Sequence, residues 1–397
     1  MSHEASQDPK ADVCLVLEGG FPQATGGVSA WVTELTRNLP DVRFAIANLR
    51  HDGGPRSGSP ADGGLAENVV SMVDVPVDPD RGALAERLPD ATIYHACITG
   101  HASDAAARAA DEHGRPMLLT EHGLAWREAG WISGCNPHGQ LLPKADRARS
   151  ARRVGAQARA AYARADAITS VCSVNLAAQR RMGAPRARSL LIPNPAPEAS
   201  LAQTGPEPGR FTVGFVGRVV PIKDLLTLIR AAALVRGELP AADFVIVGPM
   251  DHDPAYAQRC QELVRSLDLA EAVTFVGEAD PADWYHRFDA LALTSRSEAQ
   301  PLVLLEAMAA GLPSVATRVG GCPELVGEPV PGRRRSVAGL LVPPADPRAT
   351  ADAILALGRD PQLRQRLGAA GRERARQHHR AAHVWDTYHG LYDRVAA

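Results

Sequence analysis

The sequence lacks the features that mark membrane-spanning and nucleic-acid-binding proteins. No apolar run approaches the roughly 20 residues that a membrane helix needs. Lys and Arg total 43 against 45 Asp and Glu, a net charge of −2, so no basic surface for nucleic acid is expected. The opening segment, MSHEASQDPKAD, is polar and acidic, unlike a secretory leader. We therefore expect an ordinary soluble protein with no nucleic-acid partner.

Cysteine is scarce, and metal-binding patterns are absent. The six cysteines contain no Cys-x-x-Cys pair, which favours reduced thiols, a cytoplasmic location and no zinc site. Two Asp-x-Asp sequences, Asp78-Pro79-Asp80 and Asp251-His252-Asp253, are better explained as turn and helix-capping residues. We therefore expect neither a metal nor a cofactor.

What the sequence does have is a regular alternation of short apolar runs and helical patterns. The runs include VCLVLEGG and PMLLTEHG in the first half and FTVGFVGR, FVIVGPM and ALALTS in the second. Such alternation is typical of parallel sheets covered by helices on both faces. It predicts an α/β protein with two Rossmann-like doubly wound domains.

A proline-rich segment without periodicity divides the chain. We predict an N-terminal domain over 1–195, a linker over 196–210 and a second domain over 211–378. The final segment, 379–397, has an aromatic stripe at helical spacing and is expected to pack as a helix on the body of the protein.

The strongest motif is SRSEAQPLVLLEAMAAG. Glu298 follows a predicted strand, and Glu306 lies eight residues later, inside a helix that begins near Pro301. The N–H groups of Leu302 and Val303 are expected to be free at the helix start, where an anion such as phosphate is favoured. From the same helix, Glu306 would reach a cis-diol such as that of a ribose.

The second motif is GFVGRVVPIKD. Gly214 and Gly217 would allow close backbone approach at a strand end, and Arg218 and Lys223 lie in the loop before the next helix. Two cations in that place suit a diphosphate, because Arg grips two oxygens and Lys acts as a point charge. Taken alone, the pair would be better explained as two surface cations in a loop.

Two weaker motifs lie in the first half. Gly26 and Gly27 immediately precede an amphipathic helix, so backbone amides there would approach a phosphate or an acceptor closely. In LLTEHG, His122 follows a strand and would face the ligand crevice, although a core histidine is also possible. His95 is interpreted as a core histidine.

The predicted helix over 145–164 carries six arginines. A basic amphipathic helix can lie on an anionic membrane, so peripheral membrane contact is one interpretation. A solvated arginine face is the other, and the one we favour. Its arginines are Arg147, Arg149, Arg152, Arg153, Arg159 and Arg164.

With these residues in hand, the chain resembles the family 4 retaining glycosyltransferases, which have the GT-B fold of two Rossmann-like domains facing across a cleft. GGVSAWV, TEHG, GFVGRVVPIKD and EAQPLVLLEAMAAGLPSVAT are most similar to the subgroup that contains the Pel exopolysaccharide glycosyltransferase. The Gln300-Pro301 pair is a feature of that subgroup. The resemblance extends from about Val13 to the last helix.

The resemblance implies roles for individual residues. Arg218 and Lys223 would hold the donor diphosphate, and Glu306 the ribose. Glu298 would contact hydroxyls of the donor sugar, and His122 would line the sugar pocket near the reacting centre. The remaining implied donor contacts are the amides of Leu302 and Val303 and of the loop at Gly26 and Gly27.

The implied activity is metal-independent transfer of a hexosyl unit, with retention, from a nucleotide-sugar to a hydroxyl acceptor. The nucleotide would be UDP, with the base held near the strand ends VGPM and VTFVGE. The last helix would return to the first domain. Two alternatives stay open: a UDP-sugar epimerase of the same fold, and a catalytically silent sugar-nucleotide-binding subunit of a synthase complex.

Overall fold

The computed structural model forms two compact units. Unit 1 draws on Met1–Gly130, Lys144–Pro193 and Ala382–Ala397, and unit 2 mainly on Asn194–Ala381. The residues that the structure describes are 11–19, 21–22, 26–50, 65–77, 85–132, 144–198, 209–327 and 337–397.

Unit 1 contains a seven-stranded sheet in the order β3-β2-β1-β4-β5-β6-β7, and all its strand pairs are parallel. The strand order reverses between β1 and β4, which in doubly wound sheets marks the ligand crevice. The strands are β1 (Ala11–Glu18), β2 (Phe44–Arg50), β3 (Val69–Pro76), β4 (Ala91–Ala96), β5 (Met117–Glu121), β6 (Ala167–Ser170) and β7 (Ser189–Leu191).

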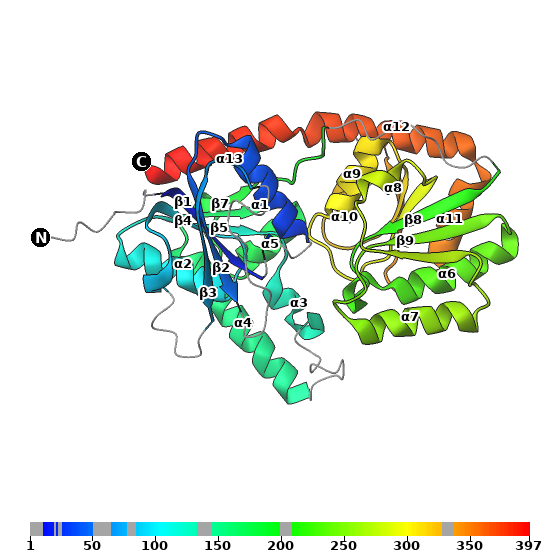
Figure 1. Ribbon diagram of the computed structural model, residues 1–397, viewed down its shortest axis with the longest axis horizontal. Coiled ribbons are helices and arrows are strands. Elements are labelled where there is room, and N and C mark those ends of the chain that lie inside the picture. The colour runs from blue at the N-terminus through cyan, green and yellow to red at the C-terminus, as the bar shows by residue number, and fades with distance from the viewer. Residues whose placement is uncertain are drawn as a thin grey trace, which may run out of the picture. The chain divides into compact units, whose positions relative to one another are not determined.

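Helices cover both faces of this sheet (Figure 1). Small residues of α2 (His101–Glu112) and α4 (Lys144–Arg164) pack on one face, where the alanines allow close approach. On the other face, α1 (Gly27–Asn38) contacts the last helix, α13 (Ala381–Ala396), through the edge-on pair Trp31–Tyr388, with 5.3 Å between ring centroids. Two shorter helices are α3 (Ala125–Ile132) and α5 (Ser173–Arg181).

Unit 2 repeats the architecture with a six-stranded parallel sheet in the order β10-β9-β8-β11-β12-β13. Its strand order reverses between β8 and β11. The strands are β8 (Phe211–Val216), β9 (Ala242–Val247), β10 (Val273–Gly277), β11 (Ala290–Leu293), β12 (Ser314–Thr317) and β13 (Gly339–Val342).

The two faces of this sheet have separate cores. On one face pack α6 (Leu225–Glu238), α7 (Pro254–Ser266) and α11 (Pro347–Arg359). On the other pack α8 (Ala282–Tyr285), α9 (Leu302–Ala310), α10 (Cys322–Val326) and α12 (Pro361–His378). Burial on both faces explains why the strands read as continuous apolar runs.

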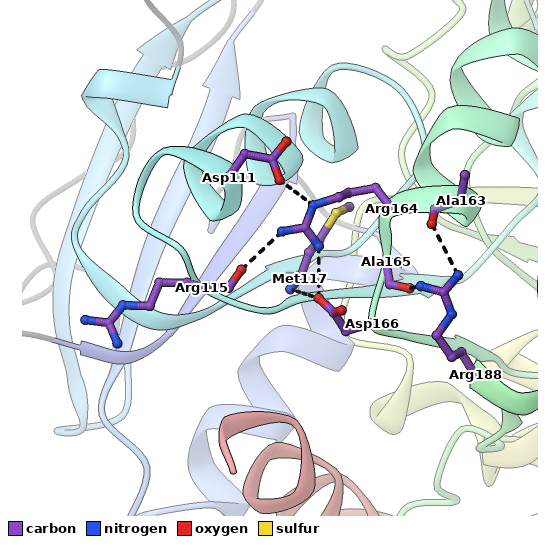
Figure 2. Close-up of polar contacts among 8 residues, drawn as sticks. All are labelled: Asp111, Arg115, Met117, Ala163, Arg164, Ala165, Asp166 and Arg188. Carbon is purple, nitrogen blue, oxygen red and sulfur yellow. Dashed lines mark hydrogen bonds and ion pairs between the residues drawn. The ribbon is translucent and has the colours of Figure 1, made fainter.

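The C-terminal end of α4 is tied into unit 1 by its last arginine (Figure 2). Arg164 Nε donates to Asp111 Oδ1 at 2.6 Å, and Nη1 donates to Asp166 Oδ2 at 2.9 Å. Its Nη2 donates to the carbonyl of Arg115 at 3.2 Å, so one guanidinium joins the end of α2 to the starts of β5 and β6. Nearby, Arg188 donates to the carbonyls of Ala163 and Ala165 at the end of the helix.

Arg164 is therefore a structural residue, and this limits the membrane interpretation of α4. That interpretation rests on exposed arginines such as Arg152 and Arg153. Within the described residues, no helix is long and apolar enough to cross a membrane.

One helix start differs from the usual capping pattern. Asp224 occupies the N-cap position of α6 but lies in the left-handed region, with φ of 48°, and its side chain accepts no bond from a backbone N–H there. Its Oδ2 atom accepts instead from Thr227 Oγ1 and from Arg296 Nε, both at 2.9 Å. Because the carboxylate is buried, a cationic partner stabilises it better than a helix N–H would.

Candidate functional site

The predicted donor-binding residues of unit 2 gather where its strand order reverses. Arg218 and Lys223 follow β8, and Glu298 and Glu306 follow β11. These are the two neighbouring strands between which the order reverses. In a doubly wound sheet, ligands bind outside the carboxyl ends of such strands. Two segments separated by about 75 residues in sequence thus flank one switch point.

Lys223 and Glu298 are in direct contact. Lys223 Nζ donates to Glu298 Oε1 at 2.5 Å, and Ser295 Oγ donates to the same oxygen at 2.6 Å. Both side chains are largely buried, with 19% and 11% of their surface exposed. The carboxylate is therefore held in place through Oε1, and its second oxygen has no hydrogen-bond partner among the described residues.

Arg218 differs from Lys223 in that its side chain has no partner among the described residues. Its side chain is exposed at the end of β8, and among the described residues it makes no hydrogen bond or ion pair. A guanidinium in this position keeps its donors available for an anion.

The loop that carries Glu298 is fixed by backbone contacts from the end of β12. Gly320 has φ of 50°, and a Cβ built on it would lie 1.5 Å from the carbonyl oxygen of Glu298. The next residue, Gly321, donates its N–H to the carbonyl of Ala299 at 2.6 Å. Only glycine permits this approach, so Gly320 determines where the Glu298 loop lies.

Gln300 anchors the other side of the loop. Its Oε1 atom accepts from the backbone N–H of Asn194 at 2.5 Å, and its carbonyl accepts from Asn194 Nδ2 at 3.0 Å. Both residues are buried. Gln300 of the Gln300-Pro301 pair therefore holds the Glu298 loop against Asn194 in this chain.

The start of α9 offers backbone donors. Pro301 occupies the N-cap position, and the helix begins at Leu302, so Leu302 and Val303 are its first two residues. Their N–H groups have no partner within the helix, and the helix dipole adds partial positive charge there. Neither of the two side chains is fully buried, which leaves this end accessible.

Glu306 lies one turn further along α9 and contacts a tyrosine that the sequence analysis did not single out. The Tyr285 hydroxyl donates to Glu306 Oε2. Burial raises the pKa of Glu306, the Tyr285 hydrogen bond opposes that rise, and the charge of Asp280 adds to it. Among the described residues, none forms a hydrogen bond or ion pair with the other carboxylate oxygen.

Unit 1 places its own predicted residues at the carboxyl ends of its central strands. Gly26 is extended, with open space where a Cβ would lie, and Gly27 begins α1. His122 directly follows β5 and lies edge-on against Trp31, with ring centroids 4.6 Å apart. Its Nε2 atom is buried and has no hydrogen-bond partner among the described residues, and burial lowers the pKa of the imidazole to about 4. His122 is therefore a neutral imidazole at pH 7 with one unused nitrogen.

His95 has no such unused nitrogen. Its Nδ1 and Nε2 atoms contact Tyr392 Oη at 2.9 Å and Thr120 Oγ1 at 2.7 Å, and the residue is fully buried. The interpretation of His95 as a core histidine is confirmed.

Glu121, beside His122, is a buried carboxylate that forms no ion pair within the described part of the chain. It accepts from Thr99 Oγ1 at 2.7 Å, Tyr162 Oη at 2.5 Å and Gln179 Nε2 at 2.7 Å. Burial raises its pKa, and these three hydrogen bonds oppose the rise. The network links β5 to α4 and α5 and so fixes the strand end from which His122 projects.

Of the two Asp-x-Asp sequences, one can be assigned. Asp253 caps α7 by accepting from the N–H of Tyr256 at 2.9 Å, which confirms its capping role. Asp78 and Asp80 lie outside the described residues. Within the described ranges no group of three or more His, Cys, Asp or Glu residues is arranged to hold a metal.

Comparisons with known proteins show what each part of the chain is similar to. Residues 210–360 match the family model "Glycosyl transferases group 1", and residues 11–81 and 69–187 match "Domain of unknown function (DUF3492)". The D-inositol 3-phosphate glycosyltransferase of Kineococcus radiotolerans is 35% identical over 215 residues, which cover 49% of each chain. The same enzyme of Streptomyces griseus is 33% identical over 51% of this chain. The alignment spans about half the length of the curated relatives that it matches.

Solved structures share the whole fold. Sucrose-phosphate synthase from Thermosynechococcus elongatus has a TM-score of 0.74 at 22% identity, covering 97% of this chain and 99% of its own. HepE of Anabaena, solved in complex with UDP-glucose, has a TM-score of 0.74 at 19% identity, covering 96% and 99%. The predicted α/β class, with the two Rossmann-like domains of the GT-B architecture, is confirmed.

Proposed function

We propose that the protein is a glycosyltransferase that moves a hexosyl unit from a nucleotide-sugar, UDP-sugar in the first instance, to a hydroxyl acceptor. One observation carries the proposal. At the switch point of unit 2, an exposed arginine, a Lys–Glu pair, a helix start and a second glutamate lie on the segments that follow β8 and β11. The similarity of residues 210–360 to group 1 glycosyl transferases supports it.

The chemistry follows from charge. When the glycosidic bond to the diphosphate breaks, negative charge grows on the leaving group and positive charge on the anomeric carbon. Arg218, Lys223 and the amides of Leu302 and Val303 would stabilise the leaving group more in the transition state than in the ground state. Retention of configuration, with the acceptor attacking on the face that the diphosphate leaves, is our prediction from the family 4 and Pel-like motifs.

A donor screen tests the proposal. The purified protein is incubated with UDP-, GDP- and ADP-sugars, and release of free nucleotide into water is measured with the sugar product. We expect slow hydrolysis of one UDP-sugar. Formation of an isomeric donor would identify an epimerase, and binding without any turnover would identify a silent subunit.

We expect activity to survive exhaustive chelation. The cations and amides at the switch point would already neutralise the diphosphate, so a divalent ion would add little. Donor hydrolysis is measured in EDTA, and in the variant in which Asp251→Asn and Asp253→Asn are combined. Turnover within a few-fold of the parent is expected in both. Complete loss in EDTA that manganese restores would contradict the metal-independent mechanism.

His122→Ala is expected to lower kcat more than it raises KM for the donor. The unused Nε2 atom is the reason, because we assign it to the sugar being transferred and not to the nucleotide. A neutral hydrogen bond contributes about 0.5–1.5 kcal/mol, so a decrease of roughly 2- to 13-fold in kcat is expected. The control is His95→Gln, which changes the core histidine and so shows the effect of a buried histidine substitution on folding alone. Unchanged turnover in His122→Ala would make His122 a core residue too.

A further inference from the structure

We propose that Tyr285 is a positioning residue of the donor site: its hydroxyl holds one oxygen of Glu306 so that the other is presented to the nucleotide ribose. The inference rests on the proposed function, because it takes the ribose as the partner of Glu306. It assigns a role to a residue that neither the motifs nor the comparisons mark.

The contact itself is specific. Tyr285 ends the four-residue helix α8, and Glu306 lies in α9, so two elements of unit 2 meet through one hydrogen bond. Tyr285 is only 2% exposed, and a buried hydroxyl is usually satisfied by a partner within the protein, which here is the carboxylate of Glu306. The donor direction is fixed as well, since a carboxylate can only accept.

Tyr285 is in turn supported from β8. Its ring packs edge-on against Phe288, with centroids 6.4 Å apart and an interplanar angle of 79°. The Phe288 ring lies so close to Gly214 that a Cβ there would be 2.2 Å from it. Gly214, the first glycine of GFVGR, therefore makes room for the aromatic support of Tyr285 and not for a ligand.

The hydrogen bond has a consequence beyond geometry. Burial raises the pKa of Glu306, and donation from Tyr285 lowers it toward its ordinary value. The other charged group that acts on it is Asp280, which raises the pKa further. Loss of the Tyr285 hydroxyl would raise the pKa of Glu306. The carboxylate would then become protonated at a higher pH than it does in the parent protein.

The test is the affinity for UDP, measured by calorimetry on the full chain, so no acceptor is needed. Tyr285→Phe keeps the ring and removes one hydroxyl, and we expect the dissociation constant of UDP to rise about 2- to 13-fold at pH 7.5. As the pH is lowered, the affinity for UDP should begin to fall at a higher pH in Tyr285→Phe than in the parent protein. Tyr256→Phe is the matched control, because Tyr256 is also 2% exposed in unit 2 but belongs to the core on the other face of the sheet.

A double variant separates this inference from the proposed function. Glu306→Gln should weaken UDP binding by itself, and adding Tyr285→Phe to it should change nothing further, because the hydroxyl acts through the carboxylate. If Glu306→Gln weakens binding while Tyr285→Phe has no effect, or adds its full effect to the double variant, Tyr285 is not a positioning residue. If Glu306→Gln leaves UDP affinity unchanged, the ribose assignment of the proposed function fails instead.

Discussion

Arg218→Ala and Lys223→Ala are each expected to lower kcat/KM for the donor by about 10- to 150-fold. The reason is the loss of charge-assisted hydrogen bonds to the diphosphate, each worth roughly 1.5–3 kcal/mol. The two variants should differ in stability. Arg218 is exposed and has no side-chain partner in the part of the chain that the structure describes, so its removal should leave the melting temperature unchanged. Lys223 neutralises Glu298, so its removal leaves a largely buried carboxylate without its cation and should lower the melting temperature.

The control for this pair is Arg230→Ala, at an exposed arginine on α6 of the same unit. Among the described residues, its side chain forms a hydrogen bond with the helix carbonyl of Leu226 and with no other group. Donor hydrolysis and thermal unfolding are measured on all three variants. Parental kinetics in both Arg218→Ala and Lys223→Ala would place the diphosphate elsewhere.

Gly320→Ala is expected to abolish most donor binding, although the residue carries no functional group. Its added Cβ would overlap the carbonyl oxygen of Glu298, so the loop that holds Glu298 must move. The left-handed backbone costs about 1–2 kcal/mol for a residue with a side chain. Overpacking typically costs about 1–3 kcal/mol more, so a clear fall in melting temperature should accompany the loss of activity.

Gly237→Ala is the matched substitution for this prediction. Gly237 lies in α6 with open space where a Cβ would point, so alanine should stabilise the helix by about 0.5–1 kcal/mol and leave turnover unchanged. The measurements are the melting temperature and the dissociation constant of UDP for both variants. A folded Gly320→Ala protein that binds UDP with parental affinity would show that the Glu298 loop does not form the site.

Much of this structure could be predicted from the sequence because strands and helix starts are indicated by residues that are close together in the chain. Apolar runs such as FTVGFVGR and ALALTS became β8 and β11, and the helix after Pro301 begins one residue later, at Leu302. Both sheets came from the same alternation, since a strand buried on two faces must be apolar throughout. The switch point then followed from strand order, which brought the predicted cations and glutamates to neighbouring strands.

What the sequence could not supply were contacts between segments that are distant along the chain. Tyr285 lies in a four-residue helix, which is too short for periodicity to predict. It is also 21 residues before Glu306, so no local pattern indicates their contact. Gly320 has a visible signal, a glycine pair after a strand, but nothing local identifies Glu298 as its neighbour. The contact between Asp224 and Arg296 is another example, because the two residues are 72 positions apart in the sequence.

Hydrogen–deuterium exchange in the presence of saturating UDP tests the central claim most directly, because it reports where the nucleotide binds. The N–H groups of Leu302 and Val303 have no helical partner and should exchange rapidly in the free protein. We predict that UDP slows exchange in peptides covering 214–225 and 295–306, while those covering α11 (Pro347–Arg359) do not change. Protection confined to other segments, or none at all at saturation, would contradict the assignment of the donor site to the switch point of unit 2.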